Sequence, residues 1–220
     1  MVFQYQFPRP TVTVDTIVLQ PQTESLRVLL IRRGNPPFSG SLALPGGFLD
    51  MDEAPKAGAL RELEEETGLH GLQIYPLFTC GQLGRDPRGR CITIVFGTLT
   101  GDSNLSPHGG DDATEASWHD VFSLSELAFD HKQVLAEAVQ NLQWQAKTAI
   151  IGRHVLPEKF CSHDLQKLYS ICGLEFSSTE IRLVIKRANE LGIIQRLEQD
   201  NAWAFCPDTM GAPDWAPLVW

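Results

Sequence analysis

The sequence has no apolar run of about 18 residues, which is the length that a membrane-spanning helix requires. Its first residues, MVFQYQFPRP, lack the basic region and apolar core of a secretory signal. The five cysteines are odd in number, scattered and without a CxxC pair, which argues against a disulfide framework and against a zinc site. We therefore expect a soluble, unexported, cytoplasmic chain with reduced thiols and no membrane partner.

Basic residues are also scarce. The chain has 18 Lys and Arg against 27 Asp and Glu, and its net charge of −9 argues against nucleic-acid binding by the whole surface. Residues 1–145 hold 10 of the basic and 18 of the acidic residues, whereas residues 146–220 hold 8 and 9. The tail is therefore close to neutral and can still carry a local basic face. At 220 residues, 43% of them apolar, the chain is long enough for one large or two small globular domains.

Hydrophobic periodicity predicts the elements of the first part of the chain. Alternating, β-branched segments predict strands at 11–19 and 26–33, and further strands lie in LQIYPLFTCGQL and CITIVFGTLT. A helix is predicted from about Glu53, with Asp52 as its N-cap, Pro55 in its first turn and Gly68 just after its end. The segment DDATEASWHDV is expected to be a polar loop that leads into a short strand. Apolar spacing in DHKQVLAEAVQNLQWQAKT predicts a second helix.

The tail has a different pattern. SHDLQKLYSI and SSTEIRLVIKRANELG predict two helices, the second opened by a capping box of Ser177 and Glu180. The apolar stripe of that second helix is expected to comprise Ile181, Val184, Ile185, Ala188 and Leu191. Two strands in IIQRLEQDNAWAF complete the order helix, helix, hairpin, which is typical of a winged helix. We expect one domain at 1–150 and a second at 151–220, with the boundary near TAIIGRHVLPEK.

Four glutamates crowd into the segment RELEEETG. On a helix, Glu62, Glu65 and Glu66 fall within about 100° of one another, while Glu64 points the opposite way. Two carboxylates near 4 Å repel by about 1–4 kcal/mol, depending on the local dielectric. A solvated acidic face is one interpretation. The other is a site for a hard divalent cation, and Mg²⁺ prefers carboxylate oxygens.

The wider spacing favours the cation site. From Gly47 the chain follows the pattern G-x5-E-x7-R-E-L-x-E-E-x-G-L through Glu53, Arg61, Glu62, Leu63, Glu65, Glu66, Gly68 and Leu69. A chance match at nine such positions is on the order of 10⁻⁹ per starting point. The segment resembles a complete Nudix box.

This resemblance implies a loop–helix–loop that binds Mg²⁺ or Mn²⁺ and hydrolyses a nucleoside diphosphate linked to another moiety. It implies that Glu62, Glu65 and Glu66 ligate the metal, that Arg61 orients these carboxylates and that Glu53 supports the loop. Gly47 and Gly68 match backbone glycines, which need a positive φ or a close approach. The implied fold is an α/β/α sandwich with a mixed sheet, followed by a small winged-helix-like α+β domain.

A further acid outside the box is usually needed as a base or as an additional ligand. The candidates are Asp111, Asp112 and Glu115, in the predicted loop before Trp118. Plain turn chemistry explains that loop equally well.

Four segments around the box, VTVDTIVL, LLIRRGNPPFSGSLALPGGFLD, GRDPRGRCITIVF and AFDHKQVLAEAV, resemble the ADP-ribose pyrophosphatase branch of the Nudix proteins. The resemblance covers roughly residues 8–150 and implies hydrolysis of ADP-ribose to AMP and ribose 5-phosphate. Arginine forks suit phosphate oxygens, so Arg32, Arg33, Arg85, Arg88 and Arg90 are candidate substrate-binding residues. The alternatives are an exposed charged hairpin for the last three and a strand end for the first two. Other Nudix substrates, such as an oxidised nucleotide, NADH or a nucleotide sugar, remain open.

A Nudix domain followed by a winged helix also resembles the Nudix-related transcriptional regulators of NAD metabolism, in which the Nudix domain senses ADP-ribose and the tail binds DNA. Two features argue against that role here: the box is intact, and the second tail helix has only Arg182, Lys186 and Arg187 as basic residues. Because DNA affinity depends on phosphate neutralisation, we favour packing or dimerisation for the tail over DNA binding. A homodimer is expected from the family alone.

Overall fold

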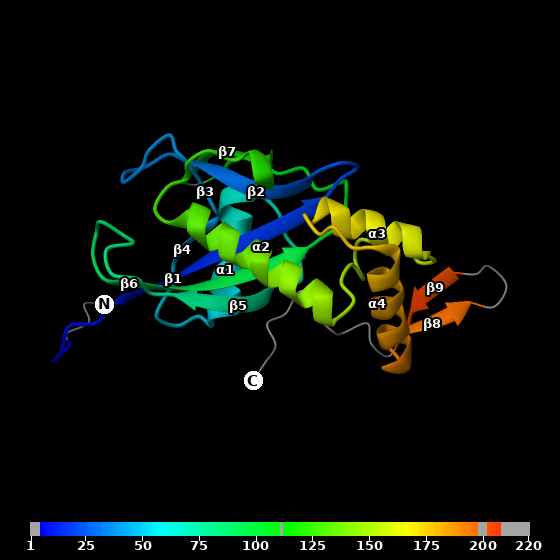
Figure 1. The fold of residues 1–220 in the computed structure, drawn as a ribbon. Helices are drawn as coiled ribbons and strands as arrows, with labels where there is room; N and C mark the ends of the chain where they lie inside the picture. The colour runs from blue at the N-terminus through cyan, green and yellow to red at the C-terminus, as the bar shows by residue number, and fades with distance from the viewer. Residues whose placement is uncertain (1–4, 111, 198–201, 208–220) are drawn as a thin grey trace.

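The computed structural model describes residues 5–110, 112–197 and 202–207 (Figure 1). The strands are β1 (Thr11–Pro21), β2 (Leu26–Arg33), β3 (Leu42–Ala43), β4 (Gly46–Phe48), β5 (Tyr75–Cys80), β6 (Cys91–Leu99), β7 (Ala113–Asp120), β8 (Ile194–Leu197) and β9 (Ala202–Phe205). The helices are α1 (Pro55–Thr67), α2 (His131–Thr148), α3 (Ser162–Ile171) and α4 (Ser178–Glu190), with a 3-10 turn η1 (Val121–Ser123). The order of the helices and of the longer strands agrees with the sequence-based prediction, whereas β3, β4 and η1 were not predicted.

Seven strands form one mixed sheet in the order β3-β2-β1-β6-β5, with β4 paired to β1 and β7 paired to β2. β1 is antiparallel to β2 but parallel to β6 over its length. A parallel pair needs a crossover connection, and the chain between β1 and β6 includes α1. The predicted mixed sheet is confirmed.

The helices α1 and α2 lie on opposite faces of this sheet (Figure 1). Because side chains alternate along a strand, β1 contributes to both interfaces. Val18 packs in one cluster with Leu63 of α1, whereas Ile17 packs in another with Leu135 and Ala138 of α2. Both layers of the predicted α/β/α sandwich are therefore present.

The tail forms α3, α4 and the antiparallel hairpin β8-β9, beside the C-terminal end of α2 (Figure 1). The capping box is confirmed, since Ser177 and Glu180 bond each other's backbone N–H groups. Leu191 was wrongly placed in the apolar stripe: it follows the end of α4 and is 64% exposed. The buried stripe of α4 consists of Ile181, Ile185 and Ala188.

One apolar cluster extends from the sheet through α2 into the tail. It contains Ile17 and Leu142 on one side of residue 150 and Phe160 and Leu168 on the other. The division into domains at 1–150 and 151–220 stays a prediction, and a shared core joins the two parts.

Two predicted boundaries were wrong. The helix α1 begins at Pro55 with Ala54 as N-cap, not near Glu53 with Asp52 as N-cap. The residue before a proline is kept out of the helical region, and Ala54 is accordingly extended, with φ −77° and ψ 147°. The polar segment before Trp118 forms the eight-residue strand β7, because pairing with β2 outweighs its low strand propensity.

All five cysteines are free, as expected from their scatter. Among the residues that the structure describes, no helix is long and apolar enough to cross a membrane.

Candidate active site

Arg61 lies at the centre of an ionic network on α1. Its guanidinium pairs with Glu53 through two nitrogens, at 2.7 Å and 3.2 Å. A third nitrogen donates to Glu62 and to Glu65, at 2.9 Å each, and the group also bonds the backbone oxygen of Phe48 at 3.2 Å. Hydrogen bonding to Arg61 lowers the pKa of Glu53. One arginine thus fixes the loop before α1 and two carboxylates of the acidic face together.

Glu66 is the buried member of that face. Its side chain is 4% exposed, and one oxygen accepts from the N–H of Gly46 at 2.9 Å. Burial raises the pKa of Glu66 to about 8 and also raises the pKa of Glu62. The protein therefore holds two carboxylates where their charge is poorly solvated, an arrangement typical of functional sites.

Two glycines allow this close packing. A Cβ atom on Gly47 would lie 2.4 Å from the carboxyl carbon of Glu62, so a larger residue there would displace the Glu62 carboxylate. Gly68 ends α1 in the left-handed region at φ 69°, and a Cβ atom there would collide with His108. Gly47 therefore allows a close approach of the backbone, and Gly68 combines a close approach with a positive φ.

The acidic face has the donor chemistry of a site for a hard divalent cation. Glu62, Glu65 and Glu66 all line one cavity of about 300 Å³, and carboxylate oxygens are the preferred ligands of Mg²⁺. Within the described residues, no group of three or more His, Cys, Asp or Glu side chains already forms a metal cage. Glu62 and Glu65 instead turn toward the guanidinium of Arg61, which neutralises them.

Of the candidate arginines, Arg33, Arg85 and Arg88 line this cavity. Burial and the charge of Arg88 lower the pKa of Arg33. Arg90 instead bonds the backbone oxygens of Gly81 and Gln82, away from the cavity. Three of the five arginines are thus brought to the acidic face.

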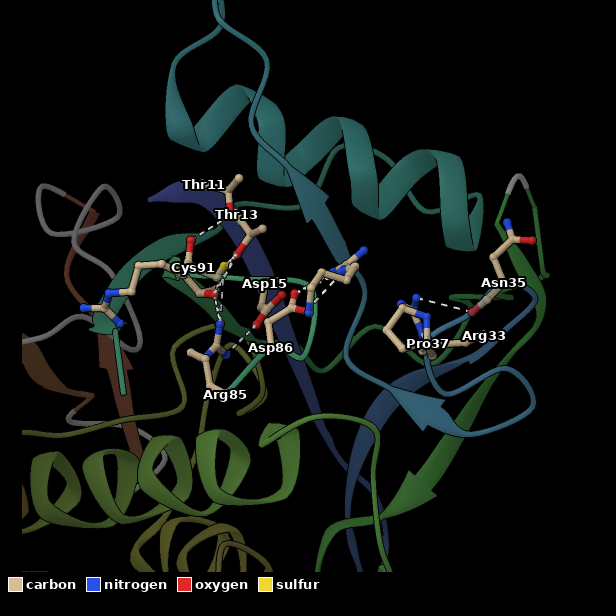
Figure 2. A network of polar contacts seen from close by, with 12 residues as sticks. Thr11, Thr13, Asp15, Arg33, Asn35, Pro37, Arg85, Asp86 and Cys91 are labelled. Atoms are coloured by element: carbon tan, nitrogen blue, oxygen red, sulfur yellow. Dashed lines mark hydrogen bonds and ion pairs between the residues drawn. The ribbon is translucent and has the colours of Figure 1, made fainter. Parts of the chain in front are cut away.

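Arg85 is almost fully buried and is already paired. It forms a two-pronged bond to Asp130, at 2.8 Å and 2.9 Å, and lies 3.8 Å from Asp15. It also contacts the hydroxyl of Thr93, and Figure 2 shows its guanidinium beside the carboxylate of Asp15. The guanidinium of Arg85 therefore forms the floor of the cavity.

The structure places Arg32 and Glu115 together, outside the cavity. They pair with each other at 3.0 Å across β2 and β7, and neither lines the cavity. Strand alternation directs Arg32 to the face opposite Arg33, and a bulge in β7 falls between their partners. Glu115 therefore stands in a strand beside Arg32 rather than in a loop over the acidic face.

Asp112 does line the cavity, just before β7, and accepts from the amide of Asn35 at 2.7 Å. Asp111 lies outside the described residues. Glu53 acts on the site through Arg61 without lining the cavity.

Several cavity residues escaped the sequence-based prediction. Asp15, on β1, is 6% exposed, and burial raises the pKa of its carboxyl group. His131 lies 3.6 Å from it and accepts the N–H of Leu44 at its Nδ1, so its proton is on Nε2. A charged residue inside the apolar strand TVTVDTIVL was the available signal for Asp15.

Asp86 and Phe129 were also missed. Asp86 is 8% exposed and holds Arg88 through both carboxylate oxygens, at 2.7–3.2 Å. Phe129 has a positive φ of 54°, which is rare for a residue with a bulky side chain. Asp86 lies in GRDPRGR two residues before its partner Arg88, and that pairing was the available signal for it. No local pattern marks Phe129, because Phe38, Arg33 and Arg88 reach its ring from other segments.

Comparison with known proteins agrees with this geometry. An ADP-ribose pyrophosphatase of Methanocaldococcus jannaschii is 40% identical over 128 residues, which cover 58% of this chain and 72% of that protein. The ADPR responsive transcriptional repressor NtrR of Acinetobacter baylyi is 30% identical over 209 residues, which cover 90% of this chain and 81% of that protein. The crystal structure of Shewanella oneidensis NrtR complexed with a 27mer DNA has a TM-score of 0.69 at 28% identity and covers 90% of this chain and 94% of that one. The NUDIX domain profile matches residues 9–142, and with the intact box on α1 this shows that the chain belongs to the Nudix family.

Proposed function

We propose that this protein hydrolyses the pyrophosphate bond of ADP-ribose, or of a closely related nucleoside diphosphate derivative, giving AMP and ribose 5-phosphate with Mg²⁺ or Mn²⁺. The observation that carries the proposal is one cavity that combines the acidic face of α1 with Arg33 and Arg88. An intact box and the similarity to an ADP-ribose pyrophosphatase support it.

Glu62, Glu65 and Glu66 are the proposed metal ligands. When bound, the divalent ions neutralise the pyrophosphate oxygens and lower the pKa of an attacking water. Arg61 positions Glu62 and Glu65 through hydrogen bonds and links them to Glu53. Because Arg61 donates to both carboxylates from a single nitrogen, it holds the two close together before any cation binds.

Asp112 is the proposed general base or additional ligand, because it lines the cavity whereas Glu115 does not. Its bond to Asn35 fixes its carboxylate. Arg33 is the proposed partner for phosphate oxygens, and Arg88 is a second proposed substrate-binding residue of the same cavity. Arg85 supports the floor through its bonds to Asp130 and Asp15.

The deciding experiment measures Mg²⁺-dependent release of AMP from ADP-ribose by wild type, Glu65→Gln and Glu66→Gln. Turnover by wild type that is no faster than turnover by these variants would overturn the proposal. A panel containing an oxidised nucleotide, NADH and a nucleotide sugar, compared by kcat/KM, identifies the preferred substrate.

We further propose a cytoplasmic homodimer. Light scattering tests the dimer, and cell fractionation tests the location.

The second candidate is an ADP-ribose-sensing transcriptional regulator. It is favoured by the similarity to NtrR, which spans the tail as well as the Nudix domain. Against it, Arg182, Lys186 and Arg187 are the only basic residues on the exposed face of α4, and Lys186 pairs with Glu190 at 3.7 Å. Sequence-specific binding to DNA upstream of NAD-salvage genes at physiological salt, altered by ADP-ribose, would reverse our preference.

A further inference from the structure

Aromatic rings and guanidinium groups alternate along the rim of the cavity. The Cζ atom of Arg88 lies 4.8 Å from the ring centroid of Phe48 and 5.5 Å from that of Phe129. The Cζ atom of Arg33 lies 4.9 Å from the same Phe129 ring. The row therefore runs Phe48, Arg88, Phe129, Arg33, and we call it the rim stack. All four residues line the cavity that contains the metal-binding glutamates.

Asp86 holds Arg88 in the rim stack. It binds two nitrogens of the guanidinium and also accepts the backbone N–H of Arg88 at 2.8 Å. With its edge engaged in this way, the guanidinium is oriented by Asp86, and its flat faces are the part left to meet aromatic rings. Arg88 was expected to contact phosphate, but its strongest contacts in this structure are to Asp86 and to the two rings.

The Phe129 ring is held in place from several sides. Phe38 packs edge-on against it with centroids 4.8 Å apart, and the His131 ring lies 5.3 Å away. Its backbone adopts a positive φ, a conformation that recurs at ligand-binding sites when the surrounding structure enforces it. The ring is therefore presented at a fixed position before any ligand arrives.

Phe48, by contrast, is open to solvent. It is 45% exposed, and the side chain of Arg88 is 42% exposed. Phe48 is therefore not a core residue. It lines a cavity in which most of the other residues are polar. A flat ligand group that covers this ring would remove its apolar face from water.

We propose that the rim stack binds the nucleobase of the substrate, which stacks on the exposed ring of Phe48 beside Arg88, while Phe129 supports the Arg88 guanidinium from its other side. Of the groups in ADP-ribose, only the base is planar and aromatic. Bases stack on aromatic rings and on arginine planes alike. Because the rim stack and the acidic face share one cavity, the base and the pyrophosphate of one molecule can be held together. This assignment rests on the proposed function and adds Phe48 and Phe129 to it as specificity-determining residues.

The test compares ligands with and without a base. AMP and ribose 5-phosphate serve as inhibitors of ADP-ribose hydrolysis, and binding of AMP is also measured by equilibrium dialysis in Mg²⁺. The variants are Phe48→Leu and Phe129→Leu, with Phe48→Tyr and Phe129→Tyr as ring-preserving partners. Phe122→Leu is the matched control, since Phe122 is 57% exposed and does not line the cavity.

The leucine variants are expected to weaken AMP binding, and to raise KM for ADP-ribose, by about tenfold. Inhibition by ribose 5-phosphate should change less than about twofold, because that ligand has no ring to stack. The tyrosine variants should recover AMP binding relative to the leucine variants, because they keep the ring, and Phe122→Leu should behave as wild type. Phe48 is exposed, so its variants test the proposal even if the Phe129 variants do not fold.

Equal losses for AMP and ribose 5-phosphate, or unchanged AMP binding in Phe48→Leu, would overturn the assignment. A wild-type protein that hydrolyses ADP-ribose but binds no AMP would overturn it as well and would leave the proposed function standing. Conversely, ring-dependent AMP binding without turnover would refute the hydrolase and support the base site.

Discussion

Replacing Glu66 by glutamine is expected to stabilise the metal-free protein at neutral and alkaline pH while removing metal-dependent turnover. Glu66 is 4% exposed, and its oxygen accepts only a backbone N–H, from Gly46, among the bonds that the structure describes. A glutamine oxygen can accept the same bond. The substitution therefore keeps the packing and the hydrogen bond and removes only the titration of the buried carboxyl group.

The pH dependence follows from the raised pKa of Glu66. The folded protein holds this proton with a pKa of about 8, against an ordinary value of 4.5. The stabilisation that the proton gives is complete below pH 4.5 and is lost as the pH rises to about 8. Linkage then predicts that wild type loses about 2–3 kcal/mol between pH 5 and pH 7 relative to the glutamine variant.

Urea denaturation in EDTA, followed by tryptophan fluorescence at pH 5 and pH 7, measures this difference. Groups other than Glu66 titrate in both proteins, so comparing the two pH series cancels them. Glu64→Gln is the control, because Glu64 is exposed on the other side of α1. Parallel pH series for wild type and Glu66→Gln would refute the assignment of a buried, poorly solvated carboxylate.

Three further predictions concern turnover, Mg²⁺ binding and stability. Glu64→Gln should retain nearly full turnover whereas Glu65→Gln should lose most of it, because of these two residues only Glu65 lines the cavity. Equal losses in a Mg²⁺-dependent AMP-release assay would contradict this placement. Arg61→Lys should weaken Mg²⁺ binding about 10- to 100-fold, as measured by titration calorimetry, since one ammonium cannot bond Glu53 and hold Glu62 and Glu65 as the separate guanidinium nitrogens do. Glu115→Gln should change kcat/KM less than about twofold and stability by less than about 1 kcal/mol, because its exposed pair with Arg32 lies outside the cavity; a loss above tenfold would restore Glu115 as a base candidate.

The sequence predicted those parts of the molecule that depend on local spacing. The face formed by Glu62, Glu65 and Glu66 follows from helical periodicity, and the cavity contains all three. Most strands and the capping box of α4 are equally local. Where a proline or a partner strand intervened, as at the start of α1 and in β7, the local pattern gave a wrong boundary.

The rest of the site depends on pairing between distant segments. Arg32 and Arg33 are neighbours with the same chemistry, and only the register with β7, including its bulge, decides which one reaches the cavity. Asp15, Arg85 and Asp130 meet from β1, the β5–β6 loop and the residue before α2. Three such segments carry no shared spacing, so no sequence pattern could join them.

The helix α2 gives the choice between enzyme and regulator a structural form. Its N-terminal end, at Asp130 and His131, borders the cavity, and its C-terminal end is packed in the core of the tail, where Gln143 donates to the backbone oxygen of Cys172 at 3.0 Å. Any ligand that moves Asp130 therefore acts on an element that both parts share. Continuity alone does not make a sensor, because a ligand shifts an equilibrium only by its differential affinity for two states of the protein. Hydrolysis needs only one arrangement of the cavity, whereas regulation through α2 needs two positions of this helix. The shared core around Leu142 and Phe160 is close-packed and favours one position.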